Sequence, residues 1–270
     1  MLRLFKKLWR NLGTKAIPVL GISVVAKMWW GALFHLRSIV KERNLYPIDR
    51  FMADGTIYQI KQHFGTLKVD PLTVDKLVPE DSCCFSNVRE LYVKDCYLHF
   101  HNIPERQFDT VIDLGANRGM ASLLFVPIAK RIIAVEAHPK YEECIKYNIQ
   151  ALNGFRNLEV GINYIGPEDK QLENGLKMIR FSTLMKTYGI EQIDFLKVDI
   201  EGAEFEIFDD LPLEKIKYLS MEVHHECGNA EKLIKKLTDN HFAVTLANND
   251  LERTDQFDKA DYVYGKNTRL

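Results

Sequence analysis

From residue 110 to the end of the chain, short apolar runs alternate with stretches that repeat at helical spacing. The apolar runs, which we expect to be strands, are 110–114, 131–137, 157–165, 193–198, 216–224, 242–247 and 262–265. The expected helices between them are 121–129, 139–152, 183–188, 203–208 and 230–237. This alternation predicts a parallel sheet with helices on both faces. No helix-length stretch separates the last two strands, so we expect these two to pair antiparallel.

The fold class that follows is a doubly wound α/β structure with a mostly parallel seven-stranded sheet, an antiparallel last strand and an N-terminal helical extension. Within the lead-in to the sheet, 55–69 predicts a β-hairpin around Gly65, and 87–100 predicts a helix that runs into an extended segment. We therefore expect three parts, namely a basic helical arm at 1–50, a small mixed α/β lead-in at 51–110 and the main domain at 111–270.

Charge is distributed unevenly along the chain. Residues 1–43 hold nine basic side chains and one acid, a net +8; the whole chain carries −1, so the remainder carries −9. This segment is either an arm that contacts an anionic membrane surface or an amphipathic helix packed on the main domain. A membrane span over 16–36 has the required length, but Lys27 in its middle costs about 2.5–3.5 kcal/mol. We expect a cytoplasmic protein with at most peripheral membrane contact.

Composition argues against several other classes. A net charge of −1 gives no electrostatic case for a nucleic-acid partner. The five cysteines are odd in number and form no C-x-x-C pair, which favours free thiols over a disulfide framework or structural zinc. His99 and His101 would share one face of a strand, but without a located third ligand they are weak evidence for zinc. We predict no metal.

The strongest local motif is Val111-Ile-Asp-Leu-Gly-Ala-Asn-Arg-Gly119. An expected strand runs into Gly115, Asn117 and Gly119, and glycines at such a turn let a ligand approach the backbone closely. A G-x-G-x-x-G dinucleotide site instead binds a pyrophosphate at the helix N-terminus. Here Asp113 would repel a phosphate and attract the cationic amino end of a zwitterionic amino acid. The pattern therefore favours S-adenosylmethionine (SAM) over NAD.

Two further acidic motifs follow expected strands. Glu136 ends the second strand, where it can accept hydrogen bonds from both ribose hydroxyls of SAM or NAD. After the fourth strand come Lys197, Asp199 and Glu201, at the sheet edge where ligands of open parallel sheets bind. Two acids and a lysine are costly to place there without a task. The alternative is that this cluster caps the next helix.

Residues 105–266 resemble the FkbM family of SAM-dependent methyltransferases. The resemblance rests on VIDLGANRG (111–119), IIAVEAHP (132–139), YNIQALN (147–153), TLMKTYGIEQIDFLKVDIEGAE (183–204) and MEVHHE (221–226). It implies a Rossmann-like seven-stranded methyltransferase fold and methyl transfer, usually to a hydroxyl of a sugar or natural product. It also implies SAM contacts at Asp113, Gly115, Asn117, Gly119 and Glu136.

The same resemblance places Asp199 and Glu201 at the reaction end of the cleft. The segment before the 183–188 helix is shorter than in most family members, and it usually helps to cover the substrate. The size and class of the acceptor, a small molecule or a glycan, therefore stay open.

Methyl transfer to a hydroxyl gains about 10²–10⁴-fold from a general base. Glu201, Asp199 and His224 are the candidates, and Lys197 completes the predicted catalytic set. Two other functions remain as alternatives. An NAD(P)-dependent oxidoreductase would share the sheet and the ribose acid, but the glycine spacing opposes it. A membrane-surface protein with a vestigial pocket would suit the basic arm, but two intact cofactor motifs count against it.

Overall fold

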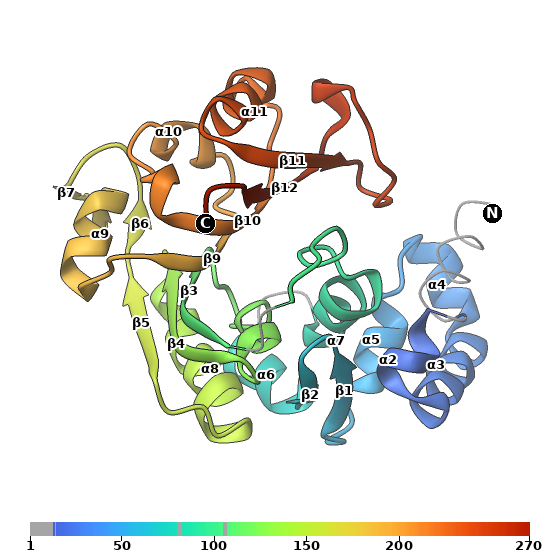
Figure 1. Cartoon of the computed structure of the whole chain (residues 1–270). Helices are drawn as coiled ribbons and strands as arrows, with labels where there is room; N and C mark the ends of the chain where they lie inside the picture. Colours follow the sequence, from blue (N-terminus) through green and yellow to red (C-terminus); the bar gives the residue numbers. More distant parts are fainter. Residues whose placement is uncertain (1–12, 14, 80–82, 105–106) are drawn as a thin grey trace. The chain divides into compact units, whose positions relative to one another are not determined.

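The structure, a computed structural model, describes residues 13, 15–79, 83–104 and 107–270. The chain forms two compact units (Figure 1). The first comprises Met1–Cys96, Arg118–Pro127 and Glu143–Phe155, and the second comprises Tyr97–Asn117, Ile128–Glu142 and Arg156–Leu270. Neither unit is continuous in sequence, whereas the three predicted parts are.

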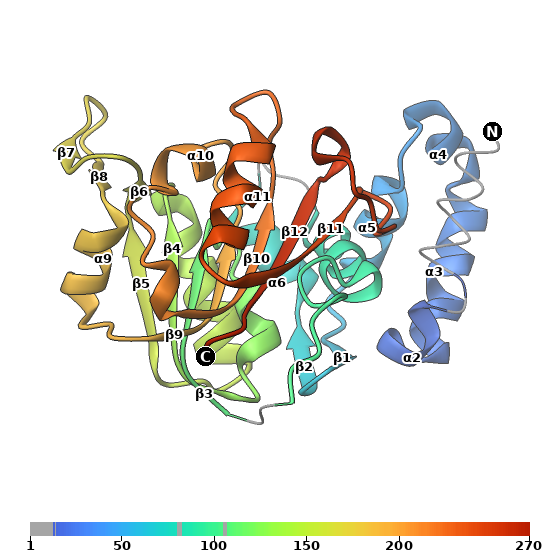
Figure 2. The same cartoon turned by 45° about the horizontal axis from the view of Figure 1, so that its top comes forward.

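The second unit is built on a seven-stranded sheet with the order β11-β12-β10-β9-β3-β4-β5 (Figure 2). Its strands are β3 (Phe108–Leu114), β4 (Ala129–Glu136), β5 (Leu158–Ile162), β9 (Ile193–Val198), β10 (Ile216–Glu222), β11 (Phe242–Ala247) and β12 (Tyr262–Asn267). Strand β12 pairs antiparallel with both β10 and β11, and the other neighbouring pairs are parallel. The predicted mostly parallel seven-stranded sheet with an antiparallel last strand is confirmed.

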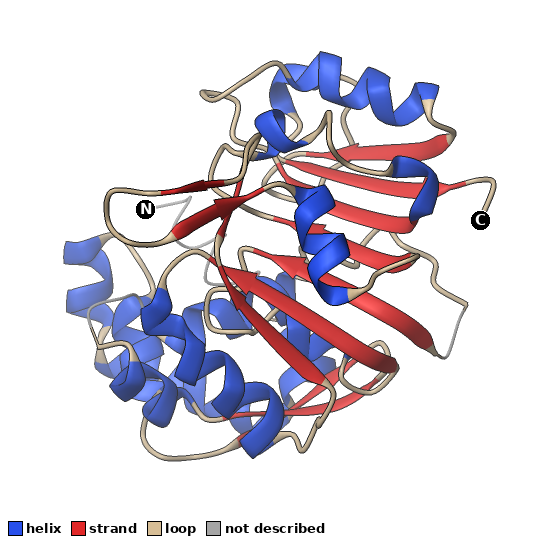
Figure 3. Ribbon diagram, turned by 90° about the vertical axis from the view of Figure 1, so that its left-hand side faces the viewer, coloured by secondary structure: helices blue, strands red, loops and turns tan. Residues whose placement is uncertain are grey.

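Helices α9 (Phe181–Tyr188), α10 (Glu204–Ile207) and α11 (Ala230–Asp239) pack on one face of this sheet (Figure 3). The side chain of Asn229 accepts a hydrogen bond from the Lys232 amide at 3.1 Å and so caps the start of α11. The buried residues of α11 recur at helical spacing and form one apolar stripe: Ala230, Leu233, Ile234 and Leu237. Burial of this stripe against the sheet holds the helix in place.

The carboxyl ends of β3, β9 and β10 lie along one edge of the sheet because these strands are parallel. The register pairs Leu114 of β3 with Val198 of β9, and Val198 with Met221 of β10. The segments that follow the three strands therefore begin side by side. Each of them carries residues that the sequence analysis singled out.

The first unit contains helices and one hairpin. Its elements are α2 (Ala16–Leu20), α3 (Ile22–Phe34), α4 (Leu36–Glu42), α5 (Tyr46–Met52), β1 (Tyr58–Gln62), β2 (Gly65–Val69), α6 (Pro71–Leu77), α7 (Cys84–Asn87), the π-helix η1 (Val88–Lys94), the 3-10 helix η2 (Ser122–Phe125) and the π-helix η4 (Tyr147–Leu152). The predicted hairpin is confirmed, with Gln62 paired to Gly65. A buried bidentate ion pair joins Arg89 to Asp49, with contacts of 2.8 and 2.6 Å.

Several predicted boundaries are wrong. Residues 121–129 form turns around η2 instead of a full helix, since Pro127 cannot continue one and β4 already begins at Ala129. Residues after Lys94 form turns where an extended segment was expected. The short segment before α9 has its own sheet, with β6 (Tyr164–Ile165), β7 (Lys170–Gln171) and β8 (Lys177–Ile179) in the order β6-β8-β7.

The helix predicted at 139–152 is continuous but changes type. It begins as the 3-10 helix η3 (Pro139–Tyr141), passes into α8 (Glu142–Lys146) and ends as η4. All five cysteines are free thiols, as predicted. Among the described residues, no helix has both the length and the apolar character that crossing a bilayer requires.

Candidate functional site

The turn after β3 needs glycine at its first position. Gly115 has φ +73°, and a Cβ there would lie 1.6 Å from the backbone oxygen of Asp199. The Asp199 amide donates to the Leu114 carbonyl at 3.2 Å, so the two segments are joined at this point. Asn117 has φ +48°, a conformation that asparagine tolerates better than most residues. The local sequence thus dictates a tight turn at the sheet edge.

Gly119 belongs to the first unit and also has a positive φ, +73°. A Cβ there would lie 3.2 Å from the Cα of Ile145 in α8. Close packing of backbone on backbone explains a glycine at this position. Its predicted contact with SAM stays a prediction.

Glu136 ends β4 with its carboxylate buried beside the glycine turn. Its Oε2 accepts from the Asn117 amide at 2.8 Å, and its Oε1 accepts from the His138 amide at 2.9 Å. A carboxylate has about four acceptor positions. The two amides leave positions for further donors, which is the requirement for binding the two hydroxyls of a ribose.

Lys197 is buried beneath the glycine turn. Its Nζ donates to the carbonyls of Leu114 and Gly115 at 3.0 and 2.6 Å, and it lies 3.1 Å from Asp113 Oδ1 and 3.6 Å from Asp199 Oδ2. Burial alone would lower the pKa of Lys197, but the charges of Asp113 and Asp199 outweigh it and raise the pKa. The ammonium therefore stays protonated and holds the turn, which favours a positioning role over contact with an acceptor.

The charges around Lys197 do not cancel. One ammonium faces the two carboxylates of Asp113 and Asp199, and the charge of Glu222 at the end of β10 also acts on it. The Tyr97 hydroxyl donates to Asp199 Oδ2 at 2.7 Å and fixes this carboxylate. The net negative charge attracts a cationic ligand. Asp113 was predicted to bind the amino end of SAM directly; here its side chain is 1% exposed and paired with Lys197.

His224, just after β10, is oriented by a buried carboxylate. Its Nδ1 lies 3.0 Å from Glu204 Oε1, which also accepts from the His224 amide at 2.8 Å. Glu204 is fully buried, and its Oε2 accepts from the Gly202 amide at 2.8 Å. The other ring nitrogen, Nε2, lies 3.4 Å from Glu201 Oε2. Nδ1 thus contacts Glu204, and Nε2 lies beside the exposed carboxylate of Glu201.

The pKa of His224 is raised above its ordinary value of 6.5. Burial acts in the opposite direction, but the hydrogen bond and charge of Glu204, with the charges of Asp199 and Glu201, more than offset it. Glu201 itself has an 88% exposed side chain and φ +55°, an uncommon conformation for a residue other than glycine. Asp199, Glu201 and His224, the three candidate general bases, thus lie close together.

The same three residues can supply one ligand atom each within 4.8 Å of one another, close enough to share a metal ion. His224 would be the third ligand beside the two carboxylates. His99 and His101, by contrast, do not lie on a strand. Burial lowers the pKa of His101 to about 4, and its Nε2 lies 2.9 Å from Ser220 Oγ.

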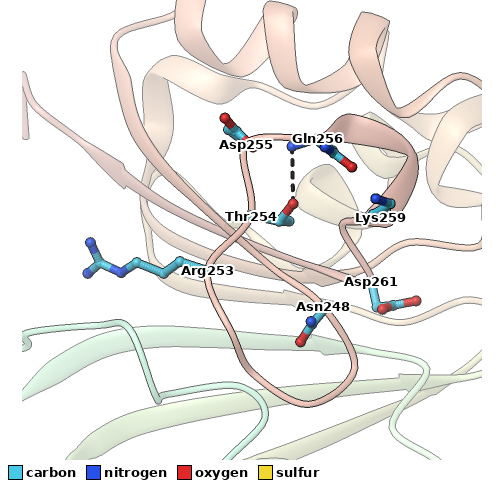
Figure 4. Close-up of a pocket in the computed structure, with 7 residues that line it drawn as sticks. All are labelled: Asn248, Arg253, Thr254, Asp255, Gln256, Lys259 and Asp261. Carbon is cyan, nitrogen blue, oxygen red and sulfur yellow. Dashed lines mark hydrogen bonds between the residues drawn. The ribbon is translucent and has the colours of Figure 1, made fainter.

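A hollow of about 760 Å³ lies in the loop between β11 and β12 (Figure 4). Every residue that lines it is polar: Asn248, Arg253, Thr254, Asp255, Gln256, Lys259 and Asp261. The Val223 amide donates to the Asp261 carbonyl at 2.9 Å, and His225 Nε2 lies 3.1 Å from the Ala260 carbonyl. These contacts tie the loop to the segment that carries His224.

Sequence reasoning missed three parts of this arrangement. Glu204 is the last acid of the 183–204 motif, but its contact with His224 was not predicted. Tyr97 gave no signal, because its segment has no recognisable motif. The 248–261 loop was treated as a simple connection, although its run of polar residues was a usable sign.

Known proteins resemble the chain in sequence and in fold. Residues 175–244 match the family described as the Methyltransferase FkbM domain. Methyltransferase sdnD of Sordaria araneosa is 25% identical over 214 residues, which cover 58% of this chain and 81% of that protein. The structure of methyltransferase FkbM from Methylobacillus flagellatus is 14% identical with a TM-score of 0.45, over 72% of this chain and 58% of that one. Fibrillarin of Aeropyrum pernix, solved with natively bound SAM, is 16% identical with a TM-score of 0.43, and the match covers 77% of this chain and 93% of that one.

The sheet order and the family match together define a class: the chain is a SAM-dependent methyltransferase with a Rossmann-like fold. Within that class, residues 175–244 are similar to the Methyltransferase FkbM domain. The matched residues include Lys197, Asp199, Glu201, Glu204 and His224. The glycine turn lies outside the matched range.

Proposed function

We propose that this methyltransferase transfers the methyl group of SAM to a hydroxyl of a polar acceptor, with His224 as the general base. The observation that carries the proposal is the His224–Glu204 pair at the carboxyl edge of the sheet. A histidine whose Nδ1 is held by a buried carboxylate presents its Nε2 in a defined orientation, as general bases require.

The residues around the glycine turn fit SAM. Bound SAM would supply an electrophilic methyl group on a positively charged sulfur. The excess negative charge of Asp113 and Asp199 over Lys197 favours a cationic ligand, and Glu136 has acceptor positions for ribose hydroxyls. A dinucleotide would bring a pyrophosphate to this negative edge, which is unfavourable.

His224 would remove the proton in the transfer step. The acceptor oxygen forms a bond to the methyl carbon while the carbon–sulfur bond breaks, its electron pair stays on sulfur, and the hydroxyl proton passes to Nε2. Glu204 then stabilises the imidazolium that forms, because its carboxylate lies 3.0 Å from Nδ1. Glu201 is the weaker candidate, since water solvates its exposed carboxylate.

The acceptor class that we propose is a hydroxyl-rich molecule such as a sugar, a glycan or a polar natural product. The hollow of the β11–β12 loop supports this, because its seven lining residues offer hydrogen-bonding groups and no apolar side chain. Ligand sites for apolar molecules are lined mainly by hydrophobic and aromatic residues. The contacts of Ala260 and Asp261 with His225 and Val223 keep this loop next to the proposed base.

Binding of S-adenosylhomocysteine, the demethylated product, tests the cofactor assignment. Calorimetry should detect binding, and the ligand at 100 times its Kd should stabilise the fold by about 2.7 kcal/mol. Glu136→Gln should weaken binding about tenfold or more, because hydrogen bonds to a charged group contribute about 1.5–3 kcal/mol. Glu191→Gln, an exposed acid before β9, is the matched control and should bind normally. Binding of NADH without binding of S-adenosylhomocysteine would refute the assignment.

The pH response of His224 tests the base, and its NMR titration needs no acceptor. The neutral imidazole is the active form, so activity should rise with pH, and its raised pKa should place that rise above pH 6.5. Glu204→Gln removes the hydrogen-bonded negative charge and should move the midpoint to lower pH. NMR titration of the imidazole C2 proton, assigned by its loss in His224→Gln, measures both midpoints. Glu206 is an exposed acid on the same helix, and Glu206→Gln is the control. An unchanged midpoint in Glu204→Gln would contradict the proposed effect of Glu204 on the pKa of His224.

A further inference from the structure

Helices α3 and α4 of the first unit expose a row of large apolar side chains. Ile22, Trp30, Leu33 and Phe34 of α3 are 74%, 58%, 67% and 71% exposed, and Val40 of α4 is 52% exposed. Within α3, at about 100° per residue, Ile22, Trp30 and Leu33 fall within one quadrant of the helix circumference, with Phe34 beside them. Val40 follows on α4. The rings of Trp30 and Phe34 lie 5.4 Å apart on this surface. We call these five residues the apolar row.

The opposite face of α3 is fixed to the rest of the first unit. Val25, Met28 and Ala32 are buried there, and a Cβ on Gly31 would lie 2.6 Å from the Phe51 ring of α5. Lys27 Nζ lies 2.5 Å from Asp54 and 2.8 Å from the Tyr58 hydroxyl. Lys27, which opposed a membrane span in the sequence, is therefore used for docking inward. The helix cannot turn its apolar row inward without breaking these contacts.

Basic side chains accompany the apolar row. Arg37 and Lys41 of α4 are exposed, and so are Lys15 and Arg43. Glu42 is the single acid among residues 1–43, and its carboxylate is paired with Arg50 at 3.1 Å. An apolar row with Trp and Phe flanked by exposed cations is complementary to an anionic lipid surface, whose interior accepts the apolar groups and whose headgroups accept the charges.

We propose that α3 and α4 bind the surface of an anionic membrane, with the apolar row inserted at the level of the headgroups and Arg37 and Lys41 on the phosphates. Helices of this kind lie in the plane of the interface, about 5–10 Å deep. The helix remains attached to the first unit through Gly31 and Lys27, so binding needs no unfolding. The enzyme would thereby work at a membrane surface without crossing the bilayer.

Tryptophan fluorescence of the full-length protein tests this proposal. In Trp9→Phe/Trp29→Phe, Trp30 is the remaining tryptophan. Its emission should shift to shorter wavelength with vesicles of phosphatidylglycerol and phosphatidylcholine, and brominated lipids should quench it. Leu33→Glu/Phe34→Glu should weaken vesicle binding more than about tenfold, because charges are disfavoured at apolar depth. Arg37→Gln/Lys41→Gln should weaken it about fivefold per charge, the equivalent of about 1 kcal/mol each.

The control is Ile57→Glu, which adds one negative charge, against two in the double variant, at an apolar residue that is 50% exposed but outside the apolar row. It should bind vesicles like the parent, and circular dichroism should show all variants folded. An unshifted and unquenched Trp30, or normal vesicle binding by Leu33→Glu/Phe34→Glu, would overturn the proposal. So would a dimer in light scattering that this variant converts to monomer, since the apolar row would then bind a second copy. The quenching measurement needs no charge substitution and so stands even where that variant misfolds.

Discussion

Replacing Lys197 with methionine is expected to lower the free energy of unfolding by about 3–5 kcal/mol, the cost of removing one partner from a buried ion pair. The ammonium lies 3.1 Å from the buried Asp113 carboxylate and donates to two carbonyls of the glycine turn. Methionine fills similar volume but leaves that carboxylate without its cation and both carbonyls without this donor. Urea unfolding with an unchanged m-value measures the difference.

Two comparisons separate the lost ion pair from general disruption. Lys197→Met/Asp113→Asn should recover part of the loss, because the uncompensated charge is removed as well. Lys235→Met changes an exposed lysine of α11 paired with Asp239 and should alter stability by less than about 0.5 kcal/mol. A loss below about 1 kcal/mol in Lys197→Met would show that the ammonium does not hold the turn.

The substitution His224→Gln should lower turnover about 10²–10⁴-fold while affinity for S-adenosylhomocysteine changes little. Glutamine retains hydrogen-bonding capacity but cannot take up the hydroxyl proton. Glu204 holds His224 in place after β10. His224 is not among the residues proposed to bind adenosine, so affinity for the cofactor product should survive the substitution. Single-turnover transfer of labelled methyl to an acceptor, found by screening hydroxylated compounds and extracts, measures the rate.

The adjacent histidine provides the control. His225 Nε2 lies 3.1 Å from the Ala260 carbonyl of the β11–β12 loop, and His225→Gln should cost less than about tenfold. Glu201→Gln tests the other candidate base. A large loss in Glu201→Gln with normal turnover in His224→Gln would assign the proton to Glu201. Loss in Asp199→Asn, Glu201→Gln and His224→Gln alike, with inactivation by EDTA and recovery with magnesium, would instead indicate a metal at these three residues.

Periodicity in the sequence was enough to predict the seven-stranded sheet, because the spacing of apolar residues that marks a strand or a helix is a local property of the sequence. The glycine turn was equally legible: Gly115 and Asn117 adopt positive φ, which few residue types tolerate, so the requirement is written in the residues themselves. The errors at 121–129 and 87–100 arose where a proline and weak periodicity left the choice between helix and turn to tertiary packing.

The partners of the charged residues were decided by tertiary structure alone. Lys197 meets Asp113 because the register of β9 against β3 sets them side by side, and no spacing along the chain encodes that register. His224 meets Glu204 because β10 ends beside the start of α10. The sequence determined which chemical groups are available at the sheet edge, since local apolar patterns end each strand there. Only folding decided which carboxylate binds the lysine, which orients the histidine and which remains in water, since these contacts join segments far apart in the chain.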